Sequence, residues 1–119
     1  MREWYCGLSD QGQAKFDTML EHLRDTPHGQ WPTNWFLPLT GYDGIYEIRF
    51  RVRNRLQRPL GCYGPERHDF TFLIPAREHG DRFEPINAPE LAQERKALIV
   101  IPGRTRECNF EDCDTEETA

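Results

Sequence analysis

Residues 45–53, with the sequence IYEIRFRVR, carry the pattern that decides the fold. Apolar and polar side chains alternate along this stretch, and a period of two is typical of a β-strand with one buried face. One face carries Tyr46, Ile48, Phe50 and Val52, and the other carries Glu47, Arg49, Arg51 and Arg53. We therefore predict a half-buried antiparallel strand over 45–53 whose second face is rich in arginine.

Helical patterns lie on both sides of this strand and indicate an α+β fold. Ser9 is a favoured N-cap, and the apolar residues after it follow helical spacing, which predicts a helix over 10–24. Near the other end, Asn87 and Glu90 have the spacing of a capping box and predict a helix over 88–99. We expect both helices, one N-terminal and one C-terminal, to pack on a small antiparallel sheet.

Three shorter apolar runs supply the rest of the sheet. Strands are predicted over 35–39, 60–63 and 69–74, because each run is bounded by the glycines and prolines typical of turns. Residues 76–82 are polar and predict a loop. The expected sheet therefore has three to four strands.

The length of 119 residues suits one domain, which we place at 1–103, followed by an acidic tail over 104–119 that we expect to be disordered. No segment approaches the roughly 20 apolar residues that cross a bilayer, so we expect a soluble, cytoplasmic protein without a membrane partner. Four scattered cysteines do not form the dense framework of a secreted disulfide protein, so we expect reduced thiols. Only Cys108 and Cys113 lie close together, and we predict neither a metal site nor a cofactor.

Charge is distributed unevenly along the chain. The net charge is −5, yet residues 49–106 hold twelve basic and seven acidic residues, and residues 107–119 hold six acidic residues and no basic one. Local charge decides association more than the total does. Arginines at alternate strand positions lie about 6.5 to 7 Å apart, which is comparable with the spacing of phosphates along one nucleic-acid strand. This pattern favours phosphate binding, and its alternative is a charged face that protects a sheet edge.

A second group of basic residues follows the arginine-rich strand. It consists of Arg58, Arg67, His68, Arg77, His79 and Arg82. We expect Arg77 and His79 to lie near the arginine-rich strand, where an imidazole could serve phosphoryl chemistry. Tyr63 could stack on a base, or it could simply pack on the sheet. The alternative for both histidines is an ordinary surface position.

The order of these features resembles the RelE/ParE toxin superfamily, and in particular its HigB-like, phage-derived branch. The distinctive segment is 44–49, with the sequence GIYEIR, preceded by Leu37-Pro38-Leu39 and followed by an arginine at the head of the next strand. The likeness covers roughly residues 1–100.

The resemblance implies the toxin of a type II toxin–antitoxin system, which cleaves mRNA on the ribosome without a metal. Its partner would be a cognate antitoxin, usually of the helix-turn-helix kind. By this resemblance the catalytic residues are Arg49, Arg58, Arg77 and His79. The residues expected to bind RNA are Arg51, Arg53, Tyr63, Arg67, His68 and Arg82. Two alternatives stay open: a ParE-like inhibitor of DNA gyrase, and a non-catalytic binding protein that uses the arginine-rich strand.

Overall fold

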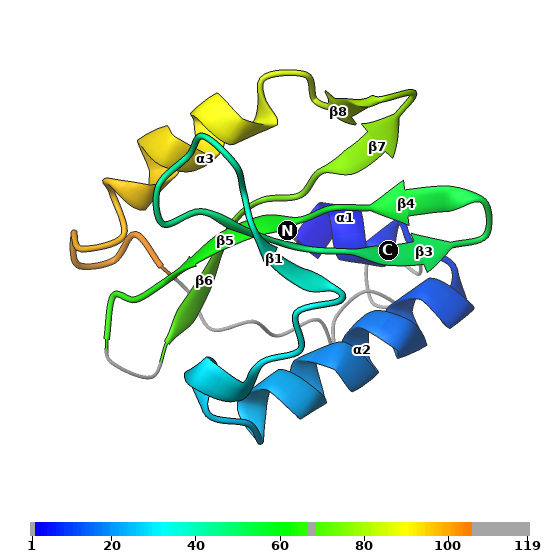
Figure 1. The fold of residues 1–119 in the computed structure, drawn as a ribbon, viewed down its shortest axis with the longest axis horizontal. Helices are drawn as coiled ribbons and strands as arrows, with labels where there is room; N and C mark the ends of the chain where they lie inside the picture. Colours follow the sequence, from blue (N-terminus) through cyan, green and yellow to red (C-terminus); the bar gives the residue numbers. More distant parts are fainter. Residues whose placement is uncertain (1, 67–68, 106–119) are drawn as a thin grey trace, which may run out of the picture.

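The computed structural model of the protein describes residues 2–66 and 69–105 (Figure 1). Its helices are α1 (Arg2–Cys6), α2 (Asp10–Arg24), the 3-10 helix η1 (His28–Gln30) and α3 (Ala88–Lys96). Its strands are β1 (Phe36–Pro38), β2 (Tyr46–Ile48), β3 (Phe50–Val52), β4 (Arg55–Gln57), β5 (Leu60–Tyr63), β6 (Phe70–Ile74), β7 (Arg77–His79) and β8 (Arg82–Glu84). The fold is α+β, as predicted.

The strands form two antiparallel sheets of four, in the orders β1-β2-β5-β6 and β3-β4-β7-β8. The two sheets follow each other along one meander, because β2 leads into β3, β4 into β5 and β6 into β7. Prolines at positions 59 and 75 coincide with two of these breaks, and proline has no N–H to donate to a neighbouring strand. The third break is at Arg49, whose N–H donates to the Trp35 carbonyl at 2.8 Å. The strand predicted over 45–53 is therefore two short strands.

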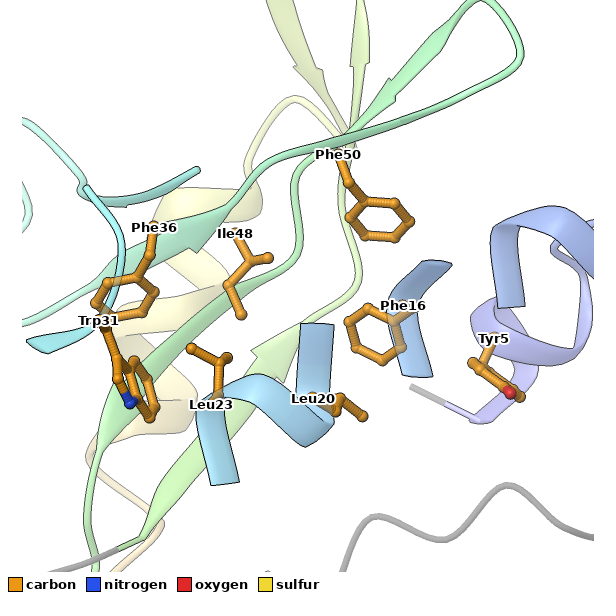
Figure 2. Close-up of a cluster of buried hydrophobic side chains, with 8 residues drawn as sticks. All are labelled: Tyr5, Phe16, Leu20, Leu23, Trp31, Phe36, Ile48 and Phe50. Atoms are coloured by element: carbon orange, nitrogen blue, oxygen red, sulfur yellow. The ribbon is translucent and has the colours of Figure 1, made fainter. Parts of the chain in front are cut away.

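Helix α2 covers one face of the meander, with the bounds that the sequence predicts. The Ser9 hydroxyl accepts a hydrogen bond from the Gly12 N–H at 3.2 Å and caps the helix. Figure 2 shows the first core under this helix, where the rings of Phe16 and Phe50 stack with centroids 5.5 Å apart. The buried residues of the first core are Tyr5, Phe16, Leu20, Leu23, Trp31, Phe36, Ile48 and Phe50.

Helix α3 covers the opposite face of β5 and β6, which gives this half of the molecule three layers (Figure 1). The second core lies beneath it and consists of Ile45, Leu60, Cys62, Leu73, Ile74, Ala76, Ala88 and Ala92. Small alanines on α3 let the helix lie close to the strands. The predicted capping box is wrong, because Asn87 makes no side-chain capping bond and Glu90 instead accepts from the Tyr42 hydroxyl at 2.8 Å.

Local patterns fail in other places as well. The polar loop predicted over 76–82 is wrong, because it forms β7 and the start of β8, joined by a turn at Gly80 and Asp81. The predicted second helix ends at Lys96 instead of residue 99, and the short helix α1 and strand β4 were not foreseen. In the part of the chain that the structure describes, no helix has the length and apolar character needed to span a bilayer. Most of the predicted acidic tail lies outside the described residues.

Candidate functional site

A buried carboxylate joins two of the predicted catalytic arginines. Glu47, only 2 % exposed, accepts from Arg49 Nε through Oε1 and from Arg58 Nε through Oε2, both at 2.8 Å. The Arg58 guanidinium also lies 3.9 Å from the centre of the Phe83 ring, and its side chain is 12 % exposed. We call Glu47, Arg49 and Arg58 the Glu47 triad. The Arg58 side chain is therefore mostly buried and its charge is paired inside the protein, whereas the Arg49 side chain is 42 % exposed.

A second ionic group lies at the far end of the meander. Glu84 Oε2 lies 2.6 Å from Arg55 Nη2 and 3.1 Å from Arg77 Nε. The register of β7 and β8 sets Arg77 opposite Glu84 and His79 opposite Arg82. Side chains that oppose each other in an antiparallel pair share a face, and so do residues two apart on one strand. We call this group, which comprises Arg55, Arg77, His79, Arg82 and Glu84, the hairpin cluster.

The hairpin cluster has a surplus of positive charge. The cluster contains three arginines and a histidine but a single carboxylate, and the hydrogen bond from Arg77 holds the pKa of Glu84 below its usual value. Arg55 and Glu84 are both nearly half exposed. Ion pairs at such positions contribute only about 0 to 1 kcal/mol. An external anion could therefore take these arginines from Glu84 at small cost, which is not true of Arg58 in the Glu47 triad.

A third feature is a groove of about 600 Å³ between helix α2 and the edge of strand β3. We call it the edge groove. Its lining combines basic and apolar side chains: Lys15, Thr18, Met19, His22, Trp35, Arg49, Phe50, Arg51 and Leu56. None of these lining residues is acidic. Across the groove, Lys15 Nζ donates to the Arg51 carbonyl at 3.1 Å.

The structure does not bring the four predicted catalytic residues together. Arg49 and Arg58 meet at Glu47 and Arg58 extends to Glu78, whereas Arg77 and His79 alternate with Glu78 on β7 and so project from the opposite face of the sheet. The expectation of a single site depended on a loop over 76–82, which could have turned these side chains toward the arginine-rich strand. A hairpin with defined register separates their faces.

The residues expected to bind RNA are also dispersed. Arg82 belongs to the hairpin cluster, Arg51 lines the edge groove, and Arg53 occupies the β3–β4 turn with φ of 57°. Arg67 and His68 lie outside the described residues.

Tyr63 lies away from these arginines, in an aromatic cluster. Its ring centroid is 4.5 Å from that of His28, 5.1 Å from Tyr46 and 5.6 Å from Phe70. Burial raises its pKa. Tyr63 therefore packs on the sheet, as the alternative interpretation of the sequence predicts.

Three residues that the sequence analysis assigns to no site belong to the hairpin cluster or line the edge groove. Arg55 lies in the basic segment over 49–106 but is assigned to no site by the sequence, and it joins the hairpin cluster through Glu84. Lys15 and His22 come from helix α2 to the edge groove. Their signal was weak, because a lysine and a histidine on a polar helix face are ordinary until the fold places them beside the arginine-rich strand.

The cysteines depart from the expected reduced state. Cys6 is disulfide-bonded, whereas Cys62 is a free and buried thiol whose pKa is raised by burial. Cys108 and Cys113 lie outside the described residues. Within the described residues, no three histidine, cysteine or acidic side chains are placed to hold a metal ion.

No protein-family model matches the chain, and neither the curated proteins nor the solved structures contain a significant match. Its function is therefore inferred from the residues and their geometry.

Proposed function

We propose that the protein binds single-stranded RNA, with the hairpin cluster as its phosphate-binding surface. The observation that carries the proposal is the convergence of Arg55 and Arg77 on one half-exposed carboxylate, with His79 and Arg82 in register on the same face. The guanidinium fork matches phosphate oxygens in a bidentate manner and stays charged at any working pH.

The energetics of the two ionic groups favour this surface over the Glu47 triad. A phosphate at the hairpin cluster would replace half-exposed, weak ion pairs with contacts to a stronger anion. A phosphate at Arg58 would have to break a buried ion pair and a cation–π contact. RNA would therefore bind across β4, β7 and β8, and Arg53 at the neighbouring turn would extend the cationic surface.

RNA binding is tested with a fluorescently labelled single-stranded RNA of twelve nucleotides, by fluorescence anisotropy across a range of salt concentrations. The test variants are Arg55→Ala and Arg82→Ala, and the matched control is Arg104→Ala, an exposed arginine outside the hairpin cluster. Each lost phosphate contact should reduce the slope of log K against log salt by about 0.7 for a single strand. An equal loss in the control, or no binding by the wild type, would show that the hairpin cluster is not an RNA site.

A second candidate function is RNA cleavage by a toxin of the RelE/ParE kind, in the cytoplasm and under control of an antitoxin. The position of His79 favours it, because the histidine lies opposite Arg82 and two residues from Arg77 on one face. The ribose 2′-oxygen would attack the adjacent phosphorus while the bond to the 5′-oxygen breaks. Arginines would stabilise the charge on the phosphoryl oxygens, His79 would accept the proton of the 2′-hydroxyl, and water would give a proton to the leaving 5′-oxygen, so that the products are a 2′,3′-cyclic phosphate and a 5′-hydroxyl.

Cleavage is tested by induced expression in bacteria, followed by mapping of mRNA 5′ ends. The variant is His79→Gln, and the control is His22→Gln, a histidine on helix α2 outside the hairpin cluster. Growth arrest with new cuts that only His79→Gln abolishes would support catalysis. Arrest without cuts, together with loss of DNA supercoiling, would instead indicate gyrase inhibition. RNA binding without arrest or cuts would leave a non-catalytic RNA-binding protein.

A further inference from the structure

The edge groove has features of a peptide-binding site that are separate from the hairpin cluster. We propose that it binds an extended acidic segment of a partner protein, which adds to the edge of strand β3 as a further strand. This inference does not rest on RNA binding, because the two surfaces involve different side chains.

The backbone of β3 gives the first argument. β3 is the terminal strand of its sheet, so within the described residues it has a strand partner on one side only. On the other side, the Arg49 N–H donates to the Trp35 carbonyl at 2.8 Å. Backbone groups of alternate residues point the same way in a strand, so the peptide groups of Arg51 face outward as well. The Lys15 ammonium, which donates to the Arg51 carbonyl, identifies this direction. The Arg51 N–H on this side has no hydrogen-bond partner among the described residues, so an added strand can pair with it and take the Arg51 carbonyl from Lys15.

Charge gives the second argument and selects the ligand. Lys15, Arg49 and Arg51 line the groove together with His22, and among the described residues no acidic side chain lines it. The Arg49 charge is partly compensated by Glu47, but neither Lys15 nor Arg51 forms an ion pair with a carboxylate of the described residues. A chain of net charge −5 thus presents a locally cationic groove. Acidic segments would be steered to it and basic segments repelled.

Apolar side chains give the third argument. Met19, Trp35 and Leu56 are partly buried and line the same groove above the buried Phe50. In an added strand, alternate side chains point to opposite sides. Apolar side chains of the segment would therefore enter the groove between flanking carboxylates that reach Lys15 and Arg51. A strand edge with an unpaired N–H matches a peptide better than a nucleic acid, whose backbone has no repeating N–H and C=O groups to pair with it.

The test uses the full chain and a labelled library of seven-residue peptides in which acidic and apolar residues alternate. The test variant is Lys15→Glu/Arg51→Glu, and the control is Arg24→Glu/Arg104→Glu, which changes the net charge equally at exposed positions outside the groove. We expect the wild type and the control to bind the library, and the groove variant to bind at least tenfold more weakly. Circular dichroism checks that each variant is folded.

Four other outcomes would overturn the proposal. Equal weakening in both variants would mean that only overall charge attracts the peptides, and no binding by the wild type would mean that the groove takes no such segment. Stronger peptide binding after neutralisation of the chain's own acidic residues, by Glu111→Gln, Asp112→Asn and Asp114→Asn, would assign the groove to that segment instead of a partner. Competition by a single-stranded RNA that Lys15→Glu/Arg51→Glu abolishes would assign it to nucleic acid.

Discussion

Replacement of Glu47 by glutamine should destabilise the protein far more than the same replacement of a half-exposed glutamate. The Glu47 carboxylate is nearly inaccessible and accepts one charged hydrogen bond on each oxygen, from Arg49 and from Arg58. Glutamine keeps only one acceptor oxygen and carries no charge. The substitution therefore leaves the guanidinium of Arg58 without its buried counter-charge beside the Phe83 ring.

The magnitude follows from the burial of the two partners. Loss of one member of a buried ion pair costs about 3 to 5 kcal/mol, and this figure applies to the largely buried Arg58. The half-exposed Arg49 adds less than about 1 kcal/mol. For a domain of this size, about 4 °C of melting temperature corresponds to 1 kcal/mol, so Tm should fall by about 12 to 20 °C.

The matched control is Glu84→Gln, which removes the same charge from a carboxylate that also contacts two arginines. Glu84 is 42 % exposed and its ion pairs are in contact with solvent, so its loss should cost much less than the loss of Glu47. Urea unfolding followed by circular dichroism measures both free energies of unfolding. The double variant Glu47→Gln/Arg58→Met should recover part of the stability, because it leaves no unpaired buried charge. A loss for Glu47→Gln that is no larger than the loss for Glu84→Gln would refute the reasoning.

Three further predictions concern the two cores and helix α1. Gly61→Ala should lower the free energy of unfolding in urea by about 1 to 3 kcal/mol, because the added Cβ would lie 2.5 Å from a ring carbon of Phe70; an unchanged midpoint would contradict this. The Cys62 thiol should react with Ellman's reagent only after unfolding, since it is buried and its pKa is raised, and fast labelling of the native protein would show otherwise. Burial and the hydrogen bond to Asp17 raise the pKa of Tyr5 to about 12. The folded state then keeps a proton that the unfolded state loses, so stability should fall as the pH rises from about 10 to about 12, and less steeply in Tyr5→Phe.

Local sequence patterns predicted the elements whose signals are complete within a few residues. Helix α2 has a capping serine and an apolar stripe of the correct period, and its bounds were predicted correctly. Strand β5 was also found, as a short apolar run between turns. The hairpin over 77–84 was missed because its charged residues have no apolar alternation. Its strands are held by pairing with β4 and with each other, which is a tertiary effect.

The candidate site could not be predicted from the residue pattern of a single strand. The sequence indicated many arginines near each other, but not which of them are paired with carboxylates. Glu47 is one polar position of an alternating strand in the sequence, yet in the fold it is buried and two arginines converge on it. Arg58 is mostly buried and paired with Glu47, whereas Arg82 is exposed. This difference depends on the positions of residues that lie far apart in the sequence.

The hairpins β3–β4 and β7–β8 are each closed by a two-residue turn, which is Arg53–Asn54 in the first and Gly80–Asp81 in the second. Both tips point away from the layered half of the molecule (Figure 1). Insertion or deletion of residues in pairs, one on each strand, keeps every remaining side chain on its own face. Related chains could therefore differ in hairpin length by even steps, and so alter the reach of the cationic surface while both cores stay as they are. Single-residue insertions at the same places would reverse the faces and should be rare.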